Sequence, residues 1–329
     1  MAALRPLVKP NITEVPKKSA DAFATTKPVA TIDPATKVGY SADFEDVEIG
    51  TKTEDAITGD GIKGVVLRGH KKADDGGVGT SKECMDTRLE FYVKTVMNHV
   101  LSSEYADCLY SYDVVNEYLH SLNAEKDSKN ITYWGLIYGT YDKSVKDHGV
   151  TLRPSYVKDA FKYAHEMLVK YNRTDVKLIY NDYNCYQNPE NIIHLVDYIN
   201  SDGKICDGIG MQSHLDITDS FHSATNYAKA LEYFRLNCPD LETQITELDA
   251  TMSSTDDKPL TDEDQAAYYD QIMNAILTNK KNGGNITALI IWSLYDGVSW
   301  RPAKFPCLFN GLYMPKSAFY AVIDAKKQY

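Results

Sequence analysis

Short apolar, β-prone runs alternate with helix-like segments over most of this chain, and no other sequence feature restricts the fold as strongly. Strands separated by helices are expected to lie parallel in one sheet. So many repeats favour a closed TIM (β/α)8 barrel over an open sheet. The sequence contains no glycine-rich phosphate loop, which argues against nucleotide binding. We predict an α/β protein with strands at 64–67, 109–115, 176–180, 208–211, 244–246 and 286–292, and helices at 81–97, 154–171, 191–200, 224–236 and 261–278.

The first 60 residues do not share this pattern. They are rich in Lys, Thr, Pro, Asp and Ala and show no sustained hydrophobic period. We therefore divide the chain of 329 residues into a divergent N-terminal segment, 1–60, and a barrel, 61–329. The first two barrel strands are not recognisable in the N-terminal segment, so we expect the barrel to be incomplete or rearranged there.

The composition argues against several classes of partner. The net charge of −11 disfavours nucleic acid and anionic membranes, and no apolar run is long enough to cross a bilayer. The six cysteines lack the spacing of a zinc site or redox motif. We therefore expect no metal, no cofactor and no disulfide framework, and a monomer that binds a neutral ligand. The 24 tyrosines, against 9 phenylalanines, suit stacking on sugar rings.

Two glutamates stand at the ends of apolar runs that are far apart in the sequence. Glu117 ends the run 111–117, Ser-Tyr-Asp-Val-Val-Asn-Glu, and Glu247 lies in the run 244–249, Gln-Ile-Thr-Glu-Leu-Asp. In barrels of alternating strands and helices, the chemistry lies at the C-terminal strand ends, where distant segments meet. Such a carboxyl pair is typical of a glycosidase, in which one group protonates the leaving oxygen and the other stabilises or attacks the oxocarbenium-like centre.

Polar and aromatic side chains follow the other predicted strands as well. A buried position does not tolerate polar groups without partners, so we expect these side chains to converge on the rim that carries the two glutamates. Together with the glutamates, they form the candidate site. The set is His70, Asn116, Tyr183, Gln212, His214, Asp249, Trp292 and Trp300.

Five segments that contain most of these residues resemble, in the same order along the chain, the strand-end motifs of glycoside hydrolase family ten. They are the segments 113–117, 177–184, 207–214, 245–249 and 292–301. The resemblance extends over about residues 67–321 and is most specific from Tyr112 onward. It implies a TIM barrel with endo-β-1,4-xylanase activity, xylan or xylo-oligosaccharide as the ligand, and secretion from the cell.

The resemblance also implies roles for the residues around the scissile bond. Glu117 corresponds to the acid/base group and Glu247 to the nucleophile of a retaining mechanism, with their carboxyl groups roughly 5 to 5.5 Å apart. Asn116 is expected to contact the sugar 2-hydroxyl, and Gln212 to steer the acid/base group.

Further roles concern the support of the nucleophile and the walls of the cleft. His214 is expected to donate a hydrogen bond to Glu247 and to be oriented by Asp249. Tyr183 and Trp292 resemble the aromatic walls of the sugar subsites. His70 and Trp300 belong to the same substrate-binding set.

The chain departs from the family's pattern on the side that binds the glycone. It lacks the family's Asn-Glu-Met-Lys segment, and Arg68-Gly-His70 continues into Lys71 where the family has Thr-Leu-Val-Trp-His. Two alternatives to a xylanase therefore stay open. One is a barrel that binds xylan with weak activity or none, and the other is a glycosidase that acts on another β-linked glycan.

Overall fold

The computed structural model describes residues 52–56, 63–65, 82–121, 133–253 and 260–325. The chain divides into two compact units, residues 1–75 and 76–329. In the first unit, β1 (Lys52–Ala56) and β2 (Lys63–Val65) pair antiparallel in a sheet of their own. The strand predicted at 64–67 thus overlaps β2, but its described partner is β1, because hydrophobic pattern identifies a strand and not its neighbour. The predicted boundary at residue 60 stays a prediction.

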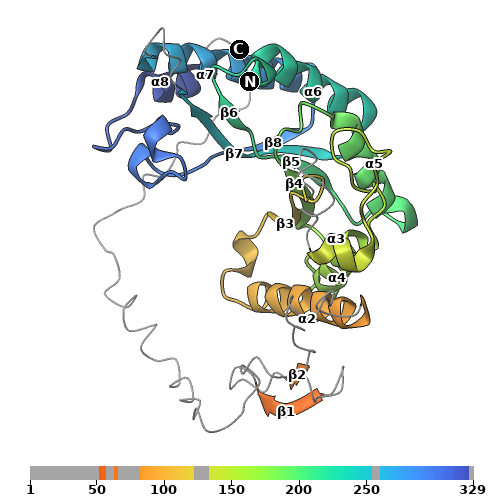
Figure 1. Cartoon of the computed structure of the whole chain (residues 1–329). Helices are drawn as coiled ribbons and strands as arrows, with labels where there is room; N and C mark the ends of the chain where they lie inside the picture. The colour runs from red at the N-terminus through yellow and green to blue at the C-terminus, as the bar shows by residue number, and fades with distance from the viewer. Residues whose placement is uncertain (1–51, 57–62, 66–81, 122–132, 254–259, 326–329) are drawn as a thin grey trace, which may run out of the picture. The chain divides into compact units, whose positions relative to one another are not determined.

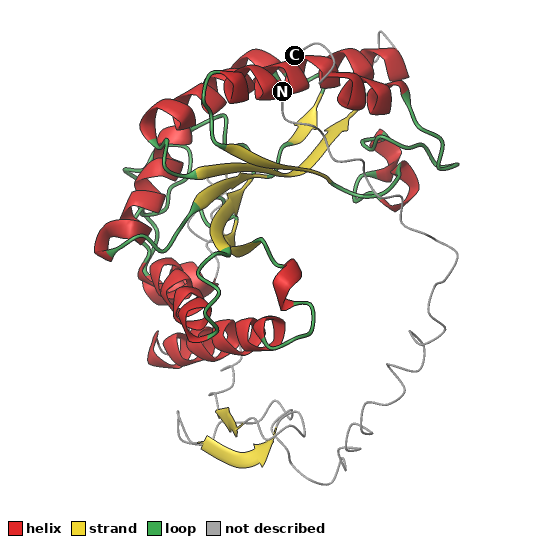
Figure 2. Ribbon diagram, turned by 180° about the vertical axis from the view of Figure 1, so that it is seen from behind, coloured by secondary structure: helices red, strands yellow, loops and turns green. Residues whose placement is uncertain are grey.

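The second unit is a parallel sheet with helices along its outer side (Figures 1 and 2). Its strands are β3 (Ser111–Asn116), β4 (Lys177–Asp182), β5 (Gly208–Met211), β6 (His214–Asp216), β7 (Glu242–Thr251) and β8 (Ile286–Ile291). Its helices are α2 (Lys82–Leu101), α3 (Tyr133–Tyr138), α4 (Ser155–Lys170), α5 (Pro189–Ile199), α6 (Ala224–Asn237), α7 (Asp262–Lys281) and α8 (Ser317–Ala325). The predicted alternation is confirmed from α2 to β8.

Strand β7 is the centre of the sheet. The order is β3-β4-β5-β7, and β6 and β8 also pair with β7, all in parallel. Strands β5 and β6 pair with successive parts of β7, since Met211 lies opposite Ile245 and His214 opposite Asp249. They occupy one strand position that is interrupted at residues 212–213, where Ser213 has a φ of 64°. This interruption lies at the edge that carries the candidate site.

The helices cover the sheet with apolar faces at helical spacing. In α4, Val157, Ala160, Phe161, Ala164 and Leu168 are buried, which matches the 3.6-residue period of a helix. Local signals fix the helix ends: Asn188 caps α5, and residues 261 and 264 form a capping box on α7.

Three observations bear on the composition of the chain. Within the described ranges, no helix is long and apolar enough to span a membrane. No group of three or more His, Cys, Asp or Glu side chains in the described part of the chain is arranged to hold a metal ion. The cysteines whose side chains are described are free thiols: Cys108, Cys185, Cys206, Cys238 and Cys307.

Candidate active site

The predicted site residues meet at the C-terminal ends of the parallel strands. His70 lies outside the described residues. The others are placed by strand ends or by the segments that follow them: Asn116 and Glu117 at the end of β3, Tyr183 after β4, Gln212 and His214 at the interruption between β5 and β6, Glu247 and Asp249 in the second half of β7, and Trp292 and Trp300 after β8.

Glu117 is held in a defined orientation directly after β3. Its φ of 60° is unusual for a residue with a side chain, and its backbone N–H donates to the carbonyl oxygen of Asn181 at 2.9 Å. The Nε2 of Gln212 donates to Glu117 Oε1 at 2.8 Å and to Asn116 Oδ1 at 2.9 Å. The contact expected between Gln212 and Glu117 is therefore present.

Asn181, at the buried end of β4, connects the two halves of the site. Its Nδ2 donates to Asn116 Oδ1 at 3.0 Å and to Glu247 Oε1 at 2.8 Å. Its Oδ1 accepts from the hydroxyl of Thr246 at 2.7 Å, so the orientation of the amide is fixed. Gly210 on β5 makes room for it, because a Cβ there would lie 2.4 Å from Asn181 Oδ1. The second glycine of the segment Gly-Ile-Gly-Met is thus explained by close packing.

These contacts join the two glutamates through one chain of hydrogen bonds. The chain runs from Glu117 through Gln212, Asn116 and Asn181 to Glu247. Each intermediate is a neutral amide, so the two carboxyl groups are positioned relative to one another without a compensating cation between them. The two side chains therefore belong to a single site.

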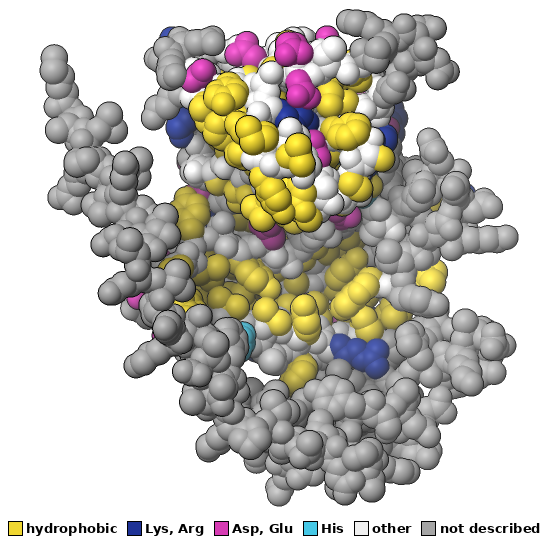
Figure 3. Space-filling view, turned by 90° about the vertical axis from the view of Figure 1, so that its left-hand side faces the viewer, with side chains coloured by type: hydrophobic (Ala, Val, Ile, Leu, Met, Phe, Trp, Pro, Cys, Tyr) yellow, Lys and Arg dark blue, Asp and Glu magenta, His cyan; other side chains and the backbone are white. Residues whose placement is uncertain are grey.

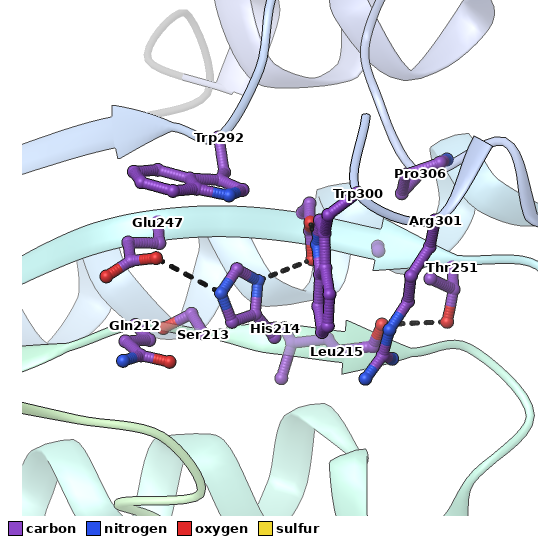
Figure 4. A network of polar contacts seen from close by, with 12 residues as sticks. Gln212, Ser213, His214, Leu215, Glu247, Thr251, Trp292, Trp300, Arg301 and Pro306 are labelled. Atoms are coloured by element: carbon purple, nitrogen blue, oxygen red, sulfur yellow. Dashed lines mark hydrogen bonds and ion pairs between the residues drawn. The ribbon is translucent and has the colours of Figure 1, made fainter. Parts of the chain in front are cut away.

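His214 bridges Glu247 and Asp249 on the other side of the site, and Figure 4 shows its contact with Glu247. Its Nε2 lies 3.2 Å from Glu247 Oε2, and its Nδ1 lies 3.0 Å from Asp249 Oδ1. Burial by itself lowers the pKa of His214, but the hydrogen bonds and negative charges of Asp249 and Glu247 outweigh it and raise this pKa to about 9. His214 is therefore a cation at neutral pH, and both oxygens of Glu247 accept hydrogen bonds.

The cation at His214 predicts a pH-dependent contribution to stability. Because the folded-state pKa of about 9 exceeds the ordinary value of 6.5, the contribution is fully present below pH 6.5 and is lost as the pH rises through about 9. We expect the unfolding free energy of the wild type to fall over this interval by up to about 3 kcal/mol more than that of His214→Gln. Urea unfolding at several pH values measures it, and parallel curves for the two proteins would contradict the assignment.

Two tryptophans from the segment after β8 flank His214. Trp300 Nε1 donates to Asp249 Oδ2 at 2.7 Å, and the Trp300 ring lies 4.7 Å from the His214 ring. Trp292 lies edge-on to His214 at 6.1 Å. With 41% and 50% of their surfaces exposed, Trp292 and Trp300 are accessible to a ligand, and both stand beside the histidine in Figure 4.

The apolar character extends along the loops that follow β8. Leu294, Leu312 and Tyr313 are largely exposed there, and hydrophobic side chains are prominent on the face shown in Figure 3. The rings of Tyr295 and Tyr313 pack at 4.3 Å. This side of the site therefore offers aromatic and apolar surface, which suits the faces of sugar rings.

Several residues of the site are absent from the predicted set. Asn181 belongs to the strand-end motif 177–184, but the sequence offered no reason to assign it a role of its own. Asp113, on β3, is in contact with solvent, yet desolvation by the surrounding protein and the negative charge of Glu247 raise its pKa to about 6. His120, three positions after Glu117, stacks on Tyr183 at 3.7 Å. Asp113 could have been noticed in the sequence, because it is a charged residue within an otherwise apolar strand. No sequence pattern distinguished His120.

Comparison with known proteins places this chain among glycan-degrading enzymes. The model of the glycosyl hydrolase family 10 matches residues 70–325. Endo-1,4-beta-xylanase A of Butyrivibrio fibrisolvens is 39% identical over 242 residues, which cover 73% of this chain and 52% of that protein. The bifunctional endo-1,4-beta-xylanase XylA of Ruminococcus flavefaciens is 33% identical over 282 residues, or 80% and 26% of the two chains. The chain thus spans about half the length of the first relative and about a quarter of the second.

Solved structures agree with these matches. A Clostridium thermocellum endo-1,4-beta-D-xylanase 10B, solved with xylohexaose, has a TM-score of 0.61 and 29% identity, covering 77% of this chain and 48% of that one. An intracellular xylanase from Thermoanaerobacterium saccharolyticum, solved as a mutant with xylotetraose, has a TM-score of 0.56 and 28% identity, covering 74% and 67%. The predicted TIM-barrel fold is confirmed by these matches, and the described residues contribute its parallel sheet from β3 to β8.

Proposed function

The chain belongs to glycosyl hydrolase family 10, and from this premise we propose that it is an endo-1,4-β-xylanase that hydrolyses xylan with retention of configuration. The observation that carries the proposal is the chain of amide hydrogen bonds that holds Glu117 and Glu247 in one site. Two carboxyl groups held in one site are what acetal hydrolysis requires. The named activity of the relatives supports the choice of xylan.

Glu117 and Glu247 have different surroundings, and this difference supports their division of labour. Glu247 accepts hydrogen bonds on both oxygens, from Asn181 and from the His214 cation, which suits an ionised nucleophile. Glu117 receives a neutral amide donor on one oxygen. In the proposed mechanism Glu247 attacks the anomeric carbon while Glu117 protonates the departing oxygen. Glu117 then removes a proton from the water that hydrolyses the glycosyl-enzyme and frees the sugar from Glu247.

Asn116 supports the transition state in this proposal. Its Oδ1 already accepts from Asn181 and Gln212, so the amide is oriented with Nδ2 as its available donor. A donor at this position, adjacent to Glu117, suits the 2-hydroxyl of the sugar that becomes attached to Glu247. Hydrogen bonds to this hydroxyl strengthen as the oxocarbenium character develops.

The proposed substrate also bears on where the protein acts. A polymer such as xylan does not cross a membrane, so cleavage of the polymer requires an extracellular enzyme, and we include secretion in the proposal. A preference for short xylo-oligosaccharides over the polymer would instead suit an enzyme inside the cell, as the relative from Thermoanaerobacterium is described. The monomeric state stays a prediction.

Hydrolysis of xylan by the purified protein tests the proposed function. We expect xylo-oligosaccharides of several lengths to appear early, because an endo-acting enzyme cuts within the polymer. Proton NMR of the first product should show the β-anomer before mutarotation, as retention requires. Release of the α-anomer first, or no cleavage of xylan, would contradict the proposal.

One observation favours a second candidate function, a barrel that binds xylan without cutting it. The family's glycone-side motifs are missing around His70 and Lys71, and each lost polar contact to a substrate is worth about 1–3 kcal/mol. Calorimetry with xylohexaose, combined with long incubation, separates the two candidates. Heat of binding without any product would select the binding protein. If the protein cleaved other β-linked glycans but not xylan, it would be a glycosidase with a different substrate.

A further inference from the structure

A buried carboxylate at the end of β4 ties two segments of the site together. Asp182 is 1% exposed and accepts hydrogen bonds from the Tyr183 backbone N–H at 2.8 Å and from His120 Nδ1 at 2.7 Å. It also accepts from the hydroxyl of Tyr180, which in turn accepts from the backbone N–H of Leu119. The segment after β3 and the segment after β4 are thus fixed to the same anion.

This arrangement stacks His120 on Tyr183. The two rings lie 3.7 Å apart at 25°, and His148 packs edge-on against His120 at 5.0 Å. Among the described residues, the Tyr183 hydroxyl makes no hydrogen bond to a side chain or to the backbone, so the orientation of its ring depends on packing. His120 is held on one edge by Asp182 and on another by the buried ring of His148. It is therefore the rigid partner in the stacked pair.

The stacked pair lies on the side of Glu117. The backbone N–H of His120 donates to the carbonyl oxygen of Glu117 at 3.2 Å. Burial, together with the negative charges of Asp182 and Glu117, raises the pKa of Tyr183. Tyr183 is half-buried, so part of its side chain is accessible to a ligand.

We propose that His120 is a positioning residue that fixes the ring of Tyr183 as the platform for the leaving-group sugar. The proposal rests on the proposed function, because it assigns a side of the same site. It predicts that His120 affects substrates with a sugar in the leaving group and does not affect substrates that lack one. A residue that merely stabilised the fold would affect both classes equally.

Two substrates separate these effects. Xylohexaose places sugars on both sides of the scissile bond, whereas β-xylobiosyl fluoride has no leaving-group sugar. For His120→Ala we expect kcat/KM on xylohexaose to fall about tenfold, the scale of a lost aromatic pair, and kcat/KM on the fluoride to change by less than about twofold. His120→Phe, which keeps a ring for stacking, should recover most of the loss. His120→Asn, which keeps a donor for Asp182, should not recover it.

A double-variant cycle with Tyr183→Ala completes the test. If His120 acts through Tyr183, the double variant should lose no more activity on xylohexaose than Tyr183→Ala alone. His194→Ala, at an exposed histidine on α5, is the matched control and should behave as the wild type. Equal losses on both substrates, or additive losses in the double variant, would overturn the proposal. A wild type inactive on both substrates would instead refute the proposed function.

Discussion

Replacement of Glu247 by alanine should lower kcat on xylohexaose by a factor on the order of 10⁵, the largest effect we expect of any single substitution. The carboxylate is the group that forms the covalent intermediate, and loss of a nucleophile removes the whole pathway through that intermediate. His214 and Asn181 would also lose their common acceptor. Initial rates of oligosaccharide release measure the effect.

Glu242→Ala provides the matched control. Glu242 lies on the same strand, β7, but at its other end, where its carboxylate accepts from the hydroxyls of Tyr110 and Thr287. This variant should keep kcat within about twofold, since surface hydrogen bonds affect stability rather than the distant chemistry.

Azide gives the Glu247→Ala experiment a stereochemical readout. With the nucleophile absent, azide can enter from the vacated face of β-xylobiosyl fluoride and displace fluoride to yield the α-glycosyl azide, with one inversion. A β-azide product, or a variant as active as the wild type, would place the nucleophile elsewhere.

The sequence predicted the fold well where elements are long and periodic. The helix α4 and the strand β4 follow from apolar runs and clear boundaries. The strand β6 was not anticipated, because it has three residues and is separated from β5 by Ser213 in a left-handed conformation. Such conformations are usually signalled by Gly, Asn or Asp, and Ser213 gives no such signal. The ladder with β7 imposes it.

The site was predictable to the extent that its residues stand at strand ends. Glu117 and Glu247 could be paired because parallel strands bring their C-terminal ends to one edge. His120 could not be assigned, because its place depends on the turn after Glu117 and on a buried anion, Asp182, contributed by another strand. A hydrogen bond between residues 62 positions apart leaves no local signal in the sequence.

Replacement of Glu117 by alanine should produce a loss that depends on the leaving group. Xylohexaose has a poor leaving group that needs protonation, so kcat/KM should fall by about 10²–10⁴. β-Xylobiosyl fluoride and dinitrophenyl β-xylobioside need little or no protonation to leave, and their glycosylation step should be nearly unchanged. The values of kcat/KM on these three substrates, which report the glycosylation step, measure the difference. Glu190→Ala, at an exposed glutamate in the first turn of α5, is the control and should leave all three rates unaltered.

The second step of the reaction distinguishes Glu117 from a residue that only shapes the cleft. Without Glu117 no base activates water, so the glycosyl-enzyme on Glu247 should accumulate on activated substrates and appear as a burst of product. Azide needs no base and should release the intermediate as the β-glycosyl azide, because two successive inversions at the same carbon retain configuration. A uniform loss across all leaving groups, without a burst and without a β-azide product, would show that Glu117 supports binding and does not transfer the proton.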